Sequence, residues 1–134
     1  MDMSKQAMSK QTMSEQEMLQ QKEVILCVSN SYEMKYYLNP LFEKLPEAVK
    51  AELKIMCVFF SEEVGGIMIL LFDKEGELKI KVKIADADVL FDEIECDLRI
   101  KELQQTKQEL LNSISLYYKV LTGEITEEVL FGEE

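Results

Sequence analysis

Residues 78–84 read Leu-Lys-Ile-Lys-Val-Lys-Ile, and this alternation of apolar and charged side chains constrains the fold more than any other stretch. Successive side chains of a β-strand point to opposite faces of its sheet, so the pattern predicts a strand with one apolar face and one face of lysines. Such a strand belongs to an antiparallel sheet with one solvated face. A row of lysines is also typical of a sheet edge, because charge there discourages pairing with other chains.

The run before it, residues 67–72, is apolar on both faces and therefore predicts a strand inside the sheet. Residues 73–77 separate the two runs, and Gly76 suits the left-handed conformation that longer hairpin loops need. We expect a β-hairpin over residues 66–84 that forms the floor on which the rest of the chain packs.

Two further strands are expected upstream of this hairpin. Residues 24–28 form a short apolar run closed by a Ser-Asn-Ser turn, and residues 32–38 alternate again between apolar and polar side chains. Asn39-Pro40 then predicts a capped helical turn over residues 40–44.

A helix is expected from Pro46 to the Gly65-Gly66 stop. Its apolar residues recur at steps of three or four and form one stripe: Val49, Leu53, Met56, Phe60 and Val64. Ile55, Cys57, Val58 and Phe59 broaden this stripe, which predicts that the second half of the helix is buried nearly all round.

The acidic residues 86–97 are expected to start a second helix, with Asp88 as its cap. No helix-breaking residue follows before Thr122, which favours one long helix of roughly 50 Å at ~1.5 Å per residue. A helix of that length exceeds a small sheet, so part of it is expected to overhang the body or to be covered by a partner.

The element order β-β-α-β-β-α predicts an α+β fold, a two-layer sandwich of an antiparallel sheet of about four strands with helices packed on one face and a long C-terminal helix. Residues 23–122 are expected to be the single domain. Residues 1–22 repeat methionine at every fifth position, a low-complexity arm that we expect to be disordered, and residues 123–134 form an acidic tail.

Composition excludes several functions. The formal net charge is −11, which disfavours direct binding to a nucleic-acid backbone or to an anionic membrane surface. No run is apolar and long enough for a bilayer span, and no secretory signal is apparent, so we expect a cytoplasmic protein. The absence of histidine removes histidine-based nucleophile systems and zinc sites, and the free cysteines Cys27, Cys57 and Cys96 show no metal-binding spacing. We expect no cofactor.

The acidic segment is one candidate site. Asp86 and Asp88 begin like a calcium-binding EF-hand loop, but Phe91 occupies the position that needs glycine. A solvated helix start explains these residues more simply than a metal site. A carboxylate-based, metal-dependent enzyme that uses Asp86, Asp88 and Asp92 is therefore the weakest of the functional hypotheses.

The tyrosines are the other candidate, because aromatic rings with a polar tip are favoured at contacts. As a ligand groove or an interface they would comprise Tyr32, Tyr36, Tyr37, Tyr117 and Tyr118. Ordinary core and sheet packing is the alternative.

Three segments also carry a resemblance: Asn-Ser-Tyr-Glu-Met-Lys-Tyr-Tyr-Leu-Asn at residues 30–39, Glu-Leu-Lys-Ile-Met-Cys at 52–57 continuing to Glu-Val-Gly-Gly at 63–66, and Leu-Tyr-Tyr-Lys-Val at 116–120. Over roughly residues 23–121 the chain resembles a family of small uncharacterised proteins from clostridia-like Firmicutes, a domain of unknown function. The resemblance implies a bacterial cytoplasmic protein and carries no activity or functional residue with it.

The function that these observations favour is a non-catalytic protein-interaction or regulatory module, with a protein partner or as a homodimer formed through the long helix or a sheet edge. Whether the chain is an enzyme stays open, although the missing catalytic residues favour a binding role. The alternative is a small-ligand-binding domain with a pocket between the sheet and the first helix, lined by Tyr36, Met56 and Phe60.

Overall fold

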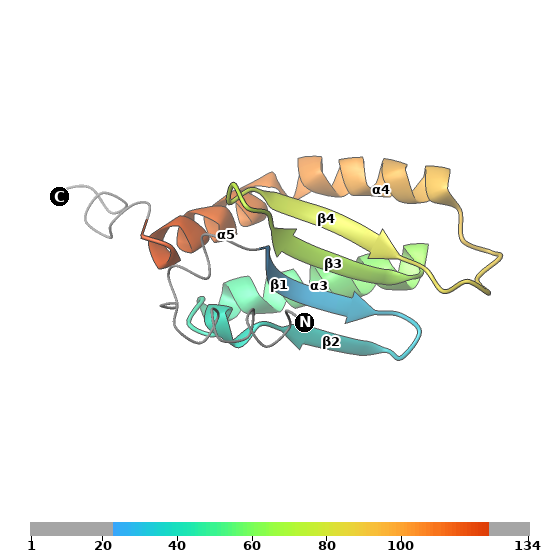
Figure 1. Ribbon diagram of the computed structural model, residues 1–134, viewed down its shortest axis with the longest axis horizontal. Coiled ribbons are helices and arrows are strands. Elements are labelled where there is room, and N and C mark those ends of the chain that lie inside the picture. The colour runs from blue at the N-terminus through green and yellow to red at the C-terminus, as the bar shows by residue number, and fades with distance from the viewer. Residues whose placement is uncertain (1–22, 124–134) are drawn as a thin grey trace, which may run out of the picture.

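The computed structural model of the chain describes residues 23–123. The predictions for the repeat arm at residues 1–22 and for the acidic tail from residue 124 onward lie outside the described residues. A four-stranded antiparallel sheet forms one layer. The helices α3 (Glu47–Val64), α4 (Glu93–Thr106) and α5 (Gln108–Leu121) lie together behind it in Figure 1. The predicted α+β class and the antiparallel sheet with helices on one face are confirmed.

The sheet has the strand order β2-β1-β3-β4. Its strands are β1 (Val24–Asn30), β2 (Lys35–Leu38), β3 (Ile67–Phe72) and β4 (Leu78–Lys83). The apolar strand β3 lies inside the sheet and the lysine-bearing strand β4 lies at its edge, as the alternation pattern predicts. Asp73 holds the turn between them, because its Oδ1 accepts hydrogen bonds from the backbone N–H groups of Glu75 and Glu77, each at 2.9 Å.

The turn between β1 and β2 is longer than predicted. β1 continues to Asn30, and β2 begins only at Lys35, so the strand expected from residue 32 loses its first three residues. The cause is Asn30, whose Oδ1 accepts hydrogen bonds from the backbone N–H groups of Tyr32 and Glu33 at 2.9 and 3.2 Å. Met34, with a positive φ of 56°, completes the turn.

The first helices begin where the sequence predicts. Asn39 caps the short 3-10 helix η1 (Pro40–Phe42) by accepting a hydrogen bond from the backbone N–H of Leu41. The helix α3 (Glu47–Val64) follows Pro46 and ends at Gly65, whose φ of 89° stops the helix.

The inner face of α3 packs on the sheet through Leu53, Met56, Cys57 and Phe60, which are all buried. The expectation that the second half of this helix is buried all round is wrong, since Ile55 and Phe59 are 67% and 62% exposed. The outer, apolar side of the helix has no covering element among residues 23–123.

The predicted single long helix is replaced by two, which makes the order β-β-α-β-β-α-α. α4 (Glu93–Thr106) and α5 (Gln108–Leu121) meet at Lys107, whose φ of −111° and ψ of 26° lie outside the helical region. α4 starts four residues later than expected, because Asp92, not Asp88, caps it and accepts a hydrogen bond from the backbone N–H of Glu95.

The break at Lys107 removes the predicted overhang. Residues 101–109 are polar apart from Leu103, and the helix is interrupted within this polar stretch. Both helices contribute to the same core, α4 through Cys96 and α5 through Leu110, Ile114 and Tyr118. At this end of the core the Tyr118 ring stacks on Phe72 with a centroid distance of 3.9 Å.

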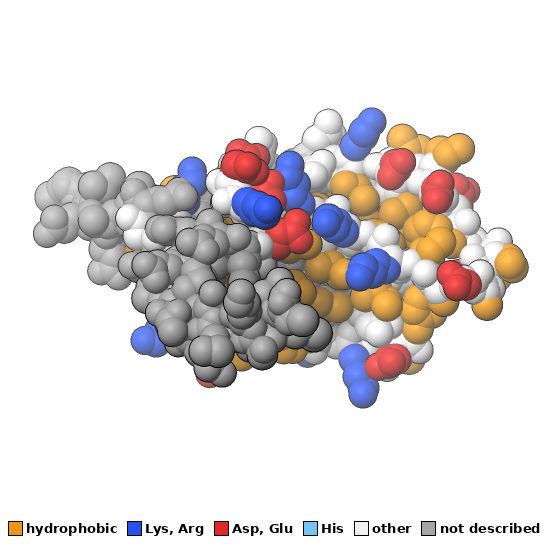
Figure 2. Space-filling model, in the orientation of Figure 1, with side chains coloured by type: hydrophobic (Ala, Val, Ile, Leu, Met, Phe, Trp, Pro, Cys, Tyr) orange, Lys and Arg blue, Asp and Glu red, His pale blue; other side chains and the backbone are white. Residues whose placement is uncertain are grey.

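The other face of the sheet is not covered by a described helix. Lys79, Lys81 and Lys83 of β4 pair in register with apolar residues of β3, which are Leu71, Ile69 and Ile67. Figure 2 shows this face, where basic side chains lie beside a band of hydrophobic ones.

Candidate functional site: a groove between α3 and α4 and a pocket beside Tyr36

α3 and α4 line a groove of about 690 Å³. On the α3 side, the small residues Ala48 and Ala51 are followed by the large, exposed side chains of Ile55 and Phe59. Leu103 and Thr106 contribute from α4. We call this feature the α3–α4 groove. Large apolar side chains that stay exposed together in a concave surface are typical of an interaction site.

Two ion pairs bridge the groove, one near each end. Lys107 Nζ lies 3.5 Å from Glu52 Oε2, and Arg99 pairs with Glu63. The earlier residue of α3, Glu52, pairs with the later partner, Lys107, and the later residue, Glu63, pairs with the earlier partner, Arg99. The two helices are therefore antiparallel. The eleven steps along α3 from Glu52 to Glu63 give a groove about 16 Å long at ~1.5 Å per residue, which is about three helical turns.

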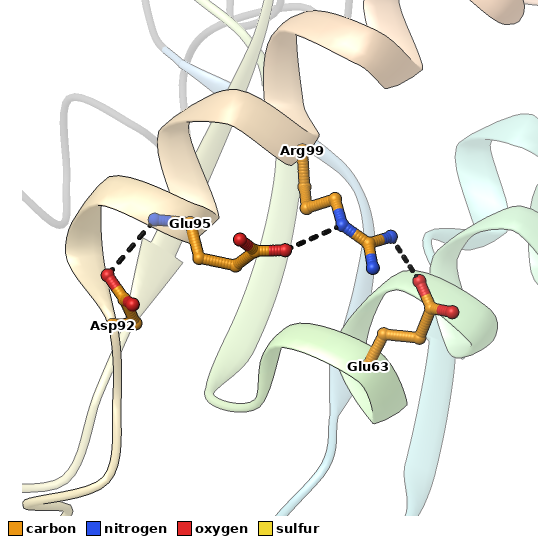
Figure 3. Close-up of polar contacts among 4 residues, drawn as sticks. All are labelled: Glu63, Asp92, Glu95 and Arg99. Carbon is orange, nitrogen blue, oxygen red and sulfur yellow. Dashed lines mark hydrogen bonds and ion pairs between the residues drawn. The ribbon is translucent and has the colours of Figure 1, made fainter.

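Arg99 is fixed by carboxylates on both helices (Figure 3). Its Nε donates a hydrogen bond to Glu95 Oε2 at 2.9 Å, and its Nη1 donates to Glu63 Oε1. These hydrogen bonds to Glu95 and Glu63 raise the pKa of Arg99 above its ordinary value. Asp92 completes the set in Figure 3 by holding the first turn of α4, so the guanidinium is built into the helix pair.

The groove is lined by more acidic than basic side chains. Its three carboxylates are Glu52, Glu63 and Glu102, against two basic side chains, which leaves one net negative charge. Arg99 and Lys107, the two bases that line the groove, are already paired with carboxylates, whereas Glu102 has no ion pair within the described part of the chain. A ligand in the groove therefore meets an apolar floor and a negative rim.

A second hollow of about 540 Å³ lies between the start of β2 and α3. We call it the Tyr36 pocket, and its polar lining comprises Ser29, Asn30, Ser31, Lys35, Tyr36, Lys54, Ser61 and Glu62. The single pocket predicted from Tyr36, Met56 and Phe60 is not formed, because Met56 and Phe60 line the α3–α4 groove instead. Met56 and Phe60 face the groove on one flank of α3, and Tyr36 lies beside its other flank. The sequence prediction had placed all three in one pocket.

The predicted tyrosines lie in four different places. Tyr36 faces α3, while Tyr37, the next residue of β2, is half exposed on the opposite face. Tyr118 is buried against Phe72, and Tyr117 lies 6.1 Å from the Phe42 ring. The structure does not bring them into one groove, and their part in binding stays a prediction.

Tyr32 instead connects the β1–β2 turn to the acidic segment. Its hydroxyl donates a hydrogen bond to Asp88 Oδ2 at 2.6 Å and accepts one from the backbone N–H of Ala85 at 3.0 Å. The hydrogen bond to Asp88 raises the pKa of Tyr32. This contact gives Tyr32 and Asp88 a structural part in the loop before α4.

The three aspartates of the predicted metal site have separate surroundings. Asp88 binds Tyr32, Asp92 caps α4, and Asp86 is exposed. Among residues 23–123, no group of three or more cysteine, aspartate or glutamate side chains is arranged to hold a metal ion.

The sequence did not identify Ile55 and Phe59 as site residues. Both are apolar, they are four residues apart, and they lie outside the stripe through Leu53, Met56 and Phe60. A second apolar stripe on a helix that packs with only one face is the signal that would have found them.

A family model matches residues 23–126, and its description is a family of unknown function, DUF6145. The chain belongs to this family. No curated protein and no solved structure matches the chain. None of the helices within residues 23–123 is both long and apolar enough to cross a membrane.

Proposed function

We propose that this DUF6145 domain is a non-catalytic protein-interaction module, and that the α3–α4 groove is its binding surface. The observation that carries the proposal is the exposure of Ile55 and Phe59 in a concave surface between two helices that are held together by ion pairs. The overhanging helix that was expected from the sequence, and that favoured a partner, is not present. The exposed apolar groove now supports the proposed interaction.

The occupant that the groove fits is an amphipathic helix of another protein with basic residues beside its apolar face. A length of about three turns suits apolar anchors at positions i, i+3 or i+4, and i+7. Ala48 and Ala51 leave room for such a helix to approach the backbone of α3 closely. The acidic rim favours lysine or arginine on its flanks.

A second copy of this chain fits less well. Each copy carries a formal net charge of −11, and pairing through this face would set two acidic helix pairs against each other. Through such a partner helix, the domain would have a regulatory role in the cytoplasm.

Titration calorimetry with a model helix tests the groove. The probe is a synthetic peptide of about four turns, with leucines at i, i+3, i+4 and i+7 and lysines elsewhere, added to the full chain. Comparison peptides have the same composition in scrambled order, or glutamates in place of the lysines. We expect saturable binding of the ordered basic peptide alone, with a stoichiometry of one.

The variant Ile55→Glu/Phe59→Glu is expected to lose this binding, because two charges would be placed on the apolar floor. Val89→Glu/Leu90→Glu is the matched control, since it adds the same charges at apolar residues that are 87% and 90% exposed. Equal binding by both variants, equal binding of the scrambled peptide, or self-association of the free chain in sedimentation would overturn the proposed occupant.

A further inference from the structure

The Tyr36 pocket lies on the opposite flank of α3 from the groove and differs from it in chemistry. The lining of the groove is mainly apolar, whereas the pocket brings two ammonium groups, several hydroxyls and one carboxylate around a space of about 540 Å³. That volume is in the range of small-molecule sites. None of the named polar residues of the pocket belongs to the groove, so the two hollows require separate explanations.

Tyr36 forms part of the pocket floor. Its hydroxyl oxygen is buried and lies beside the Cys27 and Cys57 thiols of the core. Burial, and then these two thiols, raise its pKa above the ordinary value of 10.0, so the phenol is neutral.

The hydroxyls beside it are already oriented. Ser29 Oγ and Ser61 Oγ are 2.7 Å apart and buried, and Ser61 Oγ donates to the backbone carbonyl of Val58 at 3.1 Å. Ser29 then donates to Ser61. This pair connects β1 to α3 and fixes the wall of the pocket.

The charges of the pocket are uncompensated. Neither Lys35 nor Lys54 forms an ion pair with a residue in the described range 23–123. Lys54 Nζ lies 5.9 Å from the centre of the Tyr36 ring and covers it. Glu62 is the one carboxylate that lines this pocket, so the lining carries one net positive charge.

We propose that the Tyr36 pocket binds a small organic acid that also carries a hydroxyl or ammonium group. Its carboxylate lies between Lys35 and Lys54 and balances the net charge of the lining. Its donor group faces Glu62. This site does not depend on the proposed partner helix.

The test adds common L-amino acids and the 2-hydroxy acids lactate and malate to the full chain, with inorganic phosphate as a separate arm. Thermal shift identifies a binder, since a ligand that binds only the folded state raises the melting temperature, and calorimetry measures its affinity. We expect a carboxylate probe to bind. Lys54→Gln should lower the affinity for this probe about tenfold or more, because one hydrogen bond from a charged group is lost.

Lys101→Gln is the matched control, because Lys101 is an exposed helix lysine outside the pocket. Binding of phosphate alone, a response to none of the probes, or an affinity that Lys54→Gln and Lys101→Gln change equally would overturn the proposal.

Discussion

The two sides of α3 carry similar side chains in opposite surroundings. Leu53, Met56 and Phe60 on the inner side are buried in the core, while Ile55 and Phe59 on the outer side are more than half exposed. Burial therefore follows from which side the sheet covers, and apolar composition alone does not decide it. The inner side specifies the fold, and the outer side is available for a partner.

The largest difference between the two sides should appear in stability. Leu53→Ala, at a fully buried position, is expected to lower the free energy of unfolding by about 2–5 kcal/mol, because the core loses contacts and keeps a cavity. Ile55→Ala should change it by no more than about 0.5 kcal/mol, as surface substitutions usually do. Urea unfolding of the two variants measures both. Equal losses would mean that the outer side is part of the core.

The second prediction concerns alkaline pH. The hydrogen bond with Cys27, together with burial, raises the pKa of the Cys57 thiol above 9.0, and burial raises that of the Tyr36 phenol above 10.0. The unfolded chain releases these protons first, so it binds fewer protons than the folded chain as pH rises. The contribution of these two groups to the free energy of unfolding is therefore fully present below about pH 9. It falls above that pH, by about 1.4 kcal/mol per pH unit for each proton that the unfolded chain has released and the folded chain has kept.

Unfolding free energies between pH 8 and 11 check this. Tyr36→Phe should reduce the decline above pH 10, and Tyr37→Phe, on the exposed face of the same strand, is the matched variant. Identical declines in these two variants would show that the inner face of β2 does not hold the phenol as described.

A smaller effect is expected from the hydroxyl pair on the inner side of α3. Ser61→Ala leaves the buried Ser29 hydroxyl without its partner and should cost about 1–3 kcal/mol. The double variant Ser29→Ala/Ser61→Ala should cost less than the sum of the single ones, because the two residues interact directly. Additive losses of stability in a double-mutant cycle would show that the two hydroxyls do not interact.

The smallest effect belongs to the ion pairs that bridge the groove. Glu52→Gln is expected to lower stability by less than about 1 kcal/mol, because its pair with Lys107 is half exposed. The difference should diminish in 1 M salt, where exposed charges are screened. A large, salt-independent loss would indicate that the helix pair depends on this contact for its geometry.

Much of the fold was predictable because it depends on local patterns. The alternation at residues 78–84 identified an edge strand, the apolar run at residues 67–72 identified an interior one, and Asn39 with Pro40 marked the helical turn. These signals are set by side-chain periodicity and capping, which neighbouring residues supply.

The features that were missed depend on contacts between distant segments. Lys107 interrupts the C-terminal helix where no glycine or proline stands, because both apolar ends pack on one core. Likewise, the exposure of Phe59 depends on how far α4 lies from α3, and no local pattern contains that distance. The site was therefore less predictable than the fold that supports it.

The most direct test of the interaction surface is a map of backbone amide chemical shifts of the full chain during titration with the ordered leucine–lysine peptide. We predict that the perturbed amides cluster on residues 48–63 of α3 and on residues 99–107 of α4 and its C-terminal junction, on the two sides of the groove. Perturbation centred on the sheet face opposite the helices, around Ile67 and Ile69, would contradict it, and so would the absence of any perturbation.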